Sequence, residues 1–394
     1  MLDFICFSIN AWEKRRARKQ QFMLHLSLRE DVGKVLYVEP PLNIFRLLFL
    51  PHLELQDHDN RVRWLRALKF KVDALPESRK LFIFTPLFLI PFAFRLQFIY
   101  NLNLFICFLI IKAKSKIMNF DNVVLWLYHP FDYPLLKWFK KRIVSCFDWA
   151  EDWQEYFTEL PRNKRLKVAV FEERIIKKSD VVFVVSKVLL ERAKKINPNT
   201  FQLFDGTNPE IFRNYNNGIP PDIKNIPHPI IGYVGNIFTR FDIDLVCQLS
   251  ESFFCSVVLI GNVLLEEERI SKIKEKHNIF ILGAKSFNEL PGYLLNFDVC
   301  ILPYISSLVT SPATKVYDYL ASGKPIVSTQ IPGLDEFGDL LKVSRSNEEF
   351  INLVKSSLNE DNVTLQNLRK EKASQNSWGI RSAEIMGIIS KNLK

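Results

Sequence analysis

The feature that most constrains the fold is an alternation of short apolar, β-rich runs with longer amphipathic segments, which occurs twice along the chain. Such an alternation is typical of βα units around a parallel sheet. It predicts a first series of strands in the first half of the chain and a second series after a break. The predicted strands are 3–8, 34–39, 81–85, 123–128, 143–147, 181–186 and 201–204, followed by 230–234, 257–260, 279–282, 299–303 and 325–328.

The break is residues 213–229, which contain four prolines, four asparagines and one glycine. This composition suits a linker and ends any helix or central strand. The chain has 394 residues, more than one hydrophobic core usually serves. We therefore expect an α/β protein of two Rossmann-like, doubly wound domains over 1–215 and 229–376. Their strand ends should face a central cleft, and the C-terminal helix, 377–394, should cross back to the first domain.

The net charge limits the classes of binding partner, and the cysteine content indicates the cellular compartment. The formal charge of +10 and the pI near 9.2 favour an anionic partner. No zinc-finger spacing, RNP pattern or basic zipper is present, so nucleic acid ranks last among the anionic partners. The six cysteines lie mostly in apolar runs without a C-x-x-C pair, which favours a reducing compartment. The N-terminus lacks the pattern of a signal peptide, and we expect a cytoplasmic protein.

An aromatic-rich segment, 81–111, invites a membrane interpretation. Prolines and polar residues interrupt it before about 20 apolar residues accumulate, which argues against a single span. Two interpretations stay open: a buried core segment, or a segment that docks on a bilayer surface.

The strongest chemical signal is the helix predicted after residue 310. Ser311 suits the N-cap, Gly323 suits a left-handed C-terminal cap, and a proline follows. This helix carries one polar stripe, formed by Ser311, Lys315, Asp318 and Ser322, which is either a solvated face or a binding face. As a binding face, the helix N-terminus and Lys315 would attract a diphosphate, and Asp318 would accept hydrogen bonds from a ribose.

The second half resembles the nucleotide-binding half of GT-B glycosyltransferases of family 4 type, most of all bacterial enzymes of capsular, teichuronic acid and lipopolysaccharide glycan synthesis. The resemblance rests on the order and spacing of motifs at 231–236, 242–245, 259–261, 278–283, 289–291, 297–304 and 311–327. In the first half, motifs at 8–12, 35–41, 172, 180–186 and 205–212 are similar to the acceptor half of these enzymes.

The resemblance implies transfer of a hexose-type sugar from a nucleoside-diphosphate sugar to a glycan or lipid-linked acceptor in bacterial surface polysaccharide synthesis. Asp318 matches the later acidic residue of the family's E-x7-E motif, which holds the donor ribose. Thr310 stands where the earlier glutamate lies in the family. In the family this glutamate contacts the transferred sugar, so the resemblance does not extend to that contact or to the usual retaining stereochemistry at this position. The predicted donor-binding residues are Gly235, Asn236, Arg240, Tyr304, Thr310, Ser311, Lys315 and Asp318.

Gly235 and Arg240 contribute to the predicted donor site in different ways. Gly235 would let the backbone approach the diphosphate. Arg240 stands where the family places a basic residue that binds phosphate, or it is a surface arginine. Asp242 and Asp244 have the spacing of a metal-binding pair, but the resemblance assigns them a structural role. We therefore expect no metal site and no cofactor besides the donor substrate.

The acceptor half offers two catalytic candidates at strand ends, Asp148 and His129. A buried structural aspartate and an ordinary loop histidine are the alternatives. Trp12, Arg16 and Arg18 belong to a basic cluster that either contacts a phosphorylated acceptor or is a solvated helix face. The cluster also suits anionic lipid headgroups, so we expect possible peripheral contact with the inner face of the cytoplasmic membrane.

Two other functions stay open at this point. A protein of this shape can be a nucleotide-sugar epimerase or hydrolase that needs no acceptor. It can also be a non-catalytic scaffold that binds glycan, which the threonine at position 310 leaves open.

Overall fold

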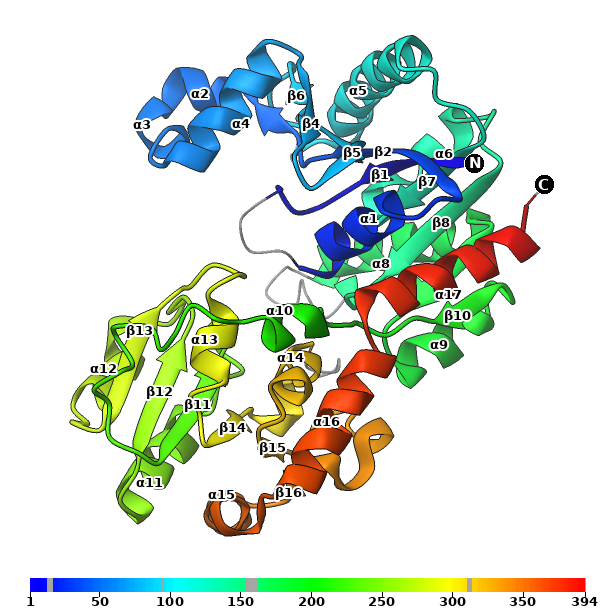
Figure 1. Ribbon diagram of the computed structural model, residues 1–394. Coiled ribbons are helices and arrows are strands. Elements are labelled where there is room, and N and C mark those ends of the chain that lie inside the picture. The colour runs from blue at the N-terminus through cyan, green and yellow to red at the C-terminus, as the bar shows by residue number, and fades with distance from the viewer. Residues whose placement is uncertain (13–16, 94, 154–161, 310–313, 394) are drawn as a thin grey trace. The chain divides into compact units, whose positions relative to one another are not determined.

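The computed structural model describes residues 1–12, 17–93, 95–153, 162–309 and 314–393 (Figure 1). The chain forms two compact units, Met1–Leu203 together with Ser382–Lys394, and Phe204–Arg381. The first unit is therefore discontinuous in sequence, and the second is inserted into it. Residues 204–215, which the sequence analysis expects in the first domain, fall in the second unit.

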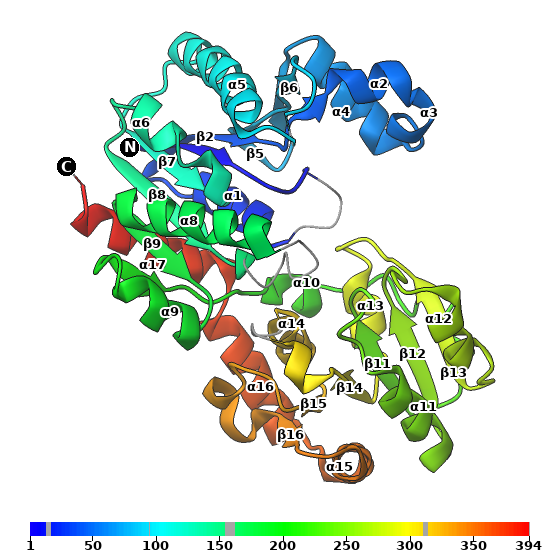
Figure 2. The same ribbon diagram turned by 180° about the vertical axis from the view of Figure 1, so that it is seen from behind.

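The first unit contains an eight-stranded sheet in the order β10-β9-β8-β7-β1-β2-β5-β4 (Figures 1 and 2). Every neighbouring pair is parallel except β4 and β5, which are antiparallel. The strands are β1 (Leu2–Phe7), β2 (Val32–Val38), β4 (Val72–Leu75), β5 (Ser78–Phe84), β7 (Val123–Leu127), β8 (Val144–Trp149), β9 (Val181–Val184) and β10 (Thr200–Gln202).

Helices and a small two-stranded sheet complete this unit. The small sheet pairs β3 (Leu42–Asn43) with β6 (Leu87–Phe88). The helices are α1 (Arg18–Ser27), α2 (Ile44–Phe49), α3 (Pro51–Glu54), α4 (His58–Leu68), α5 (Gln97–Ile117), α6 (Leu135–Trp138), α8 (Arg162–Lys178) and α9 (Lys187–Lys194). The C-terminal helix α17 (Trp378–Lys391) ends in the first unit, because that unit includes the residues from Ser382 onward.

The second unit contains a parallel six-stranded sheet in the order β13-β12-β11-β14-β15-β16. Numbered within the unit this is 3-2-1-4-5-6, the order of dinucleotide-binding Rossmann sheets. The strands are β11 (Ile230–Val234), β12 (Ser256–Ile260), β13 (Ile279–Gly283), β14 (Val299–Leu302), β15 (Ile326–Thr329) and β16 (Lys342–Ser344). The helices are α10 (Pro209–Arg213), α11 (Ile243–Ser252), α12 (Glu267–Lys274), α13 (Leu290–Leu294), α14 (Lys315–Ser322), α15 (Asn347–Glu360) and α16 (Val363–Gln375).

All the strands predicted from the sequence are present, within a few residues of the expected bounds. They were recognisable because strands of a parallel sheet covered on both faces are continuous apolar runs. The strands that the prediction missed are β3, β4, β6 and β16. Each of these is short, and the edge strands β4 and β16 carry polar or half-exposed residues instead of an apolar run.

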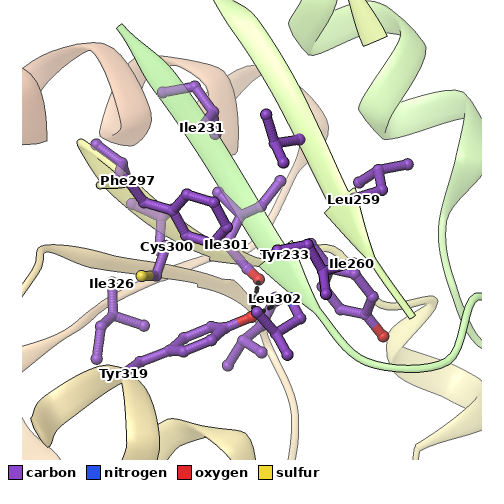
Figure 3. Packing of buried hydrophobic residues seen from close by; sticks show 14 of the residues in the cluster. Ile231, Tyr233, Leu259, Ile260, Phe297, Cys300, Ile301, Leu302, Tyr319 and Ile326 are labelled. Atoms are coloured by element: carbon purple, nitrogen blue, oxygen red, sulfur yellow. Dashed lines mark hydrogen bonds between the residues drawn. The ribbon is translucent and has the colours of Figure 1, made fainter. Parts of the chain in front are cut away.

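The core of the second unit holds α14 against the central strands (Figure 3). Phe297 packs so closely on β11 that a Cβ atom at Gly232 would lie 2.0 Å from its ring. The buried hydroxyl of Tyr319, on α14, accepts a hydrogen bond from the Val234 amide at 2.8 Å and donates to the Ile301 carbonyl at 3.4 Å. One side chain therefore links α14 to both β11 and β14.

Candidate functional site

The order of strands in the second unit indicates where a ligand would bind. β11 and β14 are neighbours at the centre of the sheet, and the connections leave them in opposite directions along it. Ligands of open α/β sheets bind beyond the carboxyl ends of the strands at such a switch point. Gly235 follows β11 directly, and Tyr304 lies two residues after β14. The helix bound to both strands, α14, begins at Lys315 in the described part of the chain.

Lys315 provides a positive charge at the switch point between β11 and β14. Its half-buried Nζ donates hydrogen bonds to the hydroxyls of Tyr304, at 2.5 Å, and Tyr233, at 3.1 Å. The same ammonium lies 4.6 Å from the ring centroid of Tyr233 and 5.2 Å from that of Tyr304. Tyr233 on β11 and Tyr304 just after β14 therefore hold the charge beside the end of β11.

Gly235 makes room for this lysine. A Cβ atom built on Gly235 would lie 2.2 Å from Lys315 Nζ and 2.8 Å from the Tyr233 hydroxyl. The residue also has φ of +153°, in the region that favours glycine. Gly261, at the end of the neighbouring strand, is as restricted, since its Cβ would lie 1.9 Å from the Gly235 carbonyl oxygen. Gly235 thus presents bare backbone next to a positive charge.

Asn236 and Arg240 lie in the same loop. The Asn236 carbonyl accepts a hydrogen bond from the Tyr233 hydroxyl at 2.9 Å. The Arg240 carbonyl accepts one from the Ile305 amide at 2.9 Å, and the next residue pairs with Tyr304 as an isolated β-bridge. The half-exposed guanidinium of Arg240 lies 5.9 Å from the ring centroid of Phe238. The backbone thus brings the Arg240 loop beside Tyr304, as a site for an anionic ligand requires.

Asp318 lies one turn further along α14 and faces a different partner. Its carboxylate accepts a hydrogen bond from the buried hydroxyl of Thr207 at 2.6 Å. Burial raises the pKa of Asp318 to about 6, the Thr207 hydrogen bond lowers it, and the nearby carboxylate of Asp205 raises it further. Such a carboxylate is ionised at pH 7, its second oxygen has no hydrogen bond from the described residues, and it can accept hydrogen bonds from a diol.

The α14 prediction is confirmed at its C-terminal end. Gly323 caps the helix with φ of +79°, the left-handed conformation expected of it. The single polar stripe is wrong, because Ser322 is buried and donates to the Tyr319 carbonyl at 2.6 Å. Among the ion pairs of the described residues, none joins Lys315 to Asp318. Thr310 and Ser311, at the predicted start of the helix, lie outside the described residues.

The pair with metal-binding spacing has structural roles in this unit. Asp242 is the N-cap of α11 and accepts a hydrogen bond from the Leu245 amide at 2.9 Å. Asp244, on the exposed first turn of α11, forms an ion pair with Lys272 at 2.8 Å. Both carboxylates are therefore occupied by the helix and its neighbour.

The first unit brings Asp148 and Arg18 together. Arg18 donates from Nε to Asp148 Oδ2 at 3.2 Å and from Nη2 to Oδ1 at 3.0 Å, with both side chains buried. Lys19 is buried as well, and its Nζ lies 3.1 Å from Glu151. A solvated helix face is therefore the wrong interpretation for these two basic residues. The neutralised, buried Asp148 is better suited to holding α1 on β8 than to accepting a proton.

His129 and Trp12 lie after β7 and β1, which are neighbours in the first sheet. Burial lowers the pKa of His129 to about 4, so its ring is neutral at pH 7. Its Nδ1 has no hydrogen-bond partner among the described residues, and its ring lies 4.8 Å from that of Trp153. The Trp12 amide donates to Glu39 at 2.6 Å, and its ring packs edge-on against Tyr37. Arg16 lies outside the described residues.

Comparison with known proteins identifies the segment that carries the lysine and the glycine. Residues 228–359 match the family model described as glycosyl transferases group 1. This segment of the second unit is similar to group 1 glycosyltransferases. It is also 24% identical over 230 residues to TuaH of Bacillus subtilis (strain 168), named as a teichuronic acid biosynthesis glycosyltransferase. That alignment covers 54% of this chain and 57% of TuaH, so it spans little more than half of either protein.

Solved structures similar to this one extend over nearly the whole chain. Sucrose-phosphate synthase from Thermosynechococcus elongatus has a TM-score of 0.71 at 14% identity, covering 99% of both chains. HepE of Anabaena, solved in complex with UDP, has a TM-score of 0.64 at 12% identity over 99% of this chain and 100% of HepE. WaaG, a glycosyltransferase of lipopolysaccharide biosynthesis, has a TM-score of 0.62 at 12% identity, with 99% of each chain covered. The chain therefore has the GT-B fold.

Two residues of the second unit that contact the candidate site were missed by sequence reasoning. Tyr233 contacts Lys315, and its position two residues before Gly235 on one strand was the signal that could have revealed it, since alternate residues share a face. Thr207 contacts Asp318 across 111 residues of sequence. No local pattern indicates that contact.

Proposed function

We propose that this protein transfers a hexose-type sugar from a nucleoside-diphosphate sugar to a glycan or lipid-linked acceptor in bacterial surface polysaccharide synthesis. The observation that carries the proposal is the contact of Lys315 with the bare backbone at Gly235, at the switch point of a segment similar to group 1 glycosyltransferases. TuaH and WaaG, named for surface glycan synthesis, support this class of acceptor.

In the proposed reaction the leaving group is a nucleoside diphosphate, so negative charge grows on phosphate oxygens as the glycosidic bond breaks. Lys315 lies where it would stabilise that charge, in the space that the missing side chain of Gly235 leaves. Arg240, whose side chain enters no ion pair among the described residues, would add a second cation. Asp318 would accept hydrogen bonds from the ribose, and Tyr304 would line the pocket beside the lysine.

We propose that the transfer needs no metal ion. The acidic pair nearest the loop after β11, Asp242 and Asp244, is engaged as a helix cap and an ion pair. Cations of the protein would then perform the task that a divalent ion performs elsewhere. Activity that survives extensive treatment with EDTA is the expected result, and loss restored by Mg²⁺ or Mn²⁺ would contradict it.

We propose that the acceptor binds to the first unit, where His129, neutral at pH 7 and just after β7, would act as the base. Trp12 lies after the neighbouring strand and would contact the acceptor. We propose a cytoplasmic location with peripheral contact to the inner face of the membrane, as a lipid-linked acceptor requires. Retention of the anomeric configuration, usual in the resembled family, is testable from the coupling of the anomeric proton in the product.

The first experiment is a thermal-shift screen with UDP, GDP, dTDP and CDP, because a ligand that binds only the folded state raises the apparent melting temperature. UDP is the first candidate, since HepE was solved with it. Lys315→Ala should abolish the shift. Lys272→Ala, which removes an exposed lysine of the same unit, is the matched control and should leave it intact.

Release of the nucleotide then separates transfer from the competing activities. Turnover that depends on added glycan or lipid-linked acceptor supports transfer, whereas equal release without acceptor would assign the protein to the hydrolases or epimerases. Absence of a shift with all four nucleotides would favour the non-catalytic scaffold and overturn the proposal.

A further inference from the structure

The first unit carries an unusual concentration of exposed apolar side chains. Of the 28 large hydrophobic residues that are exposed in the described part of the chain, 15 lie between Leu48 and Ile117. Scattered single residues of this kind are ordinary, but a contiguous group on one surface indicates an interaction site. In both views α5 lies on one side of β6 and α4 on the other (Figures 1 and 2).

The long helix α5 has two apolar faces with different environments. One face, which includes Leu104, Phe108 and Ile111, is buried in the core of the unit. The opposite face carries a stripe at spacings of four, three and four residues that is open to solvent. Its members are Phe98, Leu102, Phe105 and Leu109, which are 68%, 46%, 37% and 48% exposed.

The loop before α5 extends this stripe. Leu89, Phe92 and Leu96 are exposed there, by 41%, 57% and 46%. The buried side chain of Asn103 fixes the loop to the helix, because it accepts hydrogen bonds from two loop amides, at 2.8 and 3.0 Å, and donates one to the Ile90 carbonyl. We call these seven apolar residues the α5 face.

The charged residues of the segment that carries the α5 face have one sign. Residues 89–118 contain Arg95, Lys112, Lys114 and Lys116 and no aspartate or glutamate. Lys112 and Lys116 are exposed on the turns that follow Leu109. Exposed apolar side chains beside cations match the interface of an anionic bilayer, where acyl chains lie beneath phosphate groups. A symmetric dimer through this face would bring the like charges of two copies together.

Only the outer face of α5 is available to lipid. It is the one helix of the described residues that is long and apolar enough to cross a membrane, yet its inner face packs on the sheet. Extraction of the helix would expose that core and break the bonds of Asn103. The helix therefore suits contact parallel to a surface and not a span.

We propose that the α5 face docks the protein on a bilayer of anionic phospholipid, with Phe98, Leu102, Phe105 and Leu109 entering the interface and Lys112 and Lys116 contacting phosphate groups. This inference names the surface for the proposed membrane contact. It does not depend on the donor site, because the α5 face and Lys315 belong to different units.

Cosedimentation of the full chain with vesicles tests the apolar part. With phosphatidylglycerol–phosphatidylcholine vesicles, the substitution Leu102→Ser/Phe105→Ser/Leu109→Ser should weaken binding at least about tenfold, as expected from the area lost from the interface. The matched control is Phe254→Ser/Leu264→Ser/Ile380→Ser, which removes three apolar residues of the second unit that are 79%, 60% and 47% exposed. It should bind as the unaltered protein does, and unchanged circular dichroism of both variants confirms that they fold.

A charge variant tests the second part. Lys112→Glu/Lys116→Glu should lose binding to anionic vesicles, while Lys194→Glu/Lys195→Glu, which alters two exposed lysines near α9, should retain most of it. Equal binding of the triple serine variant and the unaltered protein would overturn the proposal. Equal binding to pure phosphatidylcholine would overturn the role of the lysines. A dimer in sedimentation velocity that the serine variant abolishes, without vesicle binding, would assign the face to self-association instead.

Discussion

At the scale of single residues, Asp318 predicts how donor binding depends on pH. Its pKa of about 6 means that the carboxylate forms as the pH rises through 6. The affinity for a nucleotide sugar should therefore increase between about pH 5 and 7 and stay level above, because the ionised form accepts hydrogen bonds from both ribose hydroxyls. Isothermal titration across this range measures the effect. The Asp318→Asn variant should bind the nucleotide sugar weakly and should lack this rise of affinity with pH, here called the pH limb. A pH limb retained in that variant would assign the titration to another group.

The raised pKa of Asp318 also affects the stability of the fold, and this effect decreases as the pH rises. The pKa of Asp318 is raised on folding from 3.8, so the folded state binds more protons than the unfolded state between about pH 4 and 6. The contribution of this group to the free energy of unfolding is complete below that window and is lost as the pH rises through it. The group is thus better suited to binding a ligand than to stabilising the fold.

Thr207 is a positioning residue for Asp318 in the proposed site. Its backbone amide bonds to the Asn376 carbonyl at 3.1 Å, and its carbonyl accepts from the Trp378 amide at 3.0 Å, so its hydroxyl has a fixed direction. Thr207→Val should raise the KM for the donor several-fold with little change in kcat, and should move the pH limb to higher pH because a hydrogen bond that lowers the pKa is lost.

Thr207→Ser keeps the hydroxyl and provides the control for this substitution. Rescue of both the KM and the pH limb by serine is the expected result. An equal loss in the two variants would point to packing of the threonine methyl group instead.

Whether a contact of the site could be predicted depends on how far apart in sequence its two residues are. Gly235, Tyr304 and Lys315 follow recognisable strands or begin a recognisable helix, so the order of the sheet was enough to bring them together. The contacts of Asp318 with Thr207 and of Arg18 with Asp148 join residues 111 and 130 positions apart. They depend on how the helices pack, which no local pattern encodes.

At the scale of elements, the left-handed cap of α14 predicts a measurable cost. Gly323→Ala forces a Cβ atom onto a residue with φ of +79° and should destabilise the protein by about 1–2 kcal/mol. The new atom would also lie 2.6 Å from Lys370 Cε, the end of a flexible side chain that can move aside. Denaturant unfolding gives the change in free energy.

Gly387→Ala is the matched control, because this exposed glycine lies inside α17 with open space around it. Alanine there should stabilise the helix by roughly 0.5–1 kcal/mol. Similar effects at the two glycines, whether gain or loss, would contradict the assignment of the cap.

Four strands of the second unit that the sequence did predict share one physical property. β11, β12, β14 and β15 are buried along their whole length and consist almost entirely of apolar residues. The sequence left two interpretations of the segment 81–111 open, a buried core segment and an exposed docking segment. Each describes one side of α5, because this helix buries one side and exposes the other. Hydrophobic periodicity alone could not separate a buried apolar face from an exposed one, since both faces of this helix are apolar.

At the scale of the whole molecule, the last thirteen residues belong to the first unit although they follow the second in sequence. Ile385 and Ile389 are fully buried on α17. Replacing either by alanine should destabilise the protein by about 2–4 kcal/mol, from lost transfer free energy and the cavity that remains. Because α17 ends in the first unit, the destabilisation should be concentrated there.

Hydrogen exchange resolved by peptide can locate that loss. We expect faster exchange in peptides of the first unit and unchanged exchange in β11, β12 and β14, together with an unaltered affinity for the donor nucleotide. Ile388→Ala, at a half-buried position of the same helix, should have a smaller effect. Faster exchange throughout the second unit would mean instead that the two units unfold as one cooperative body, so that the end of the chain stabilises the proposed donor site as well.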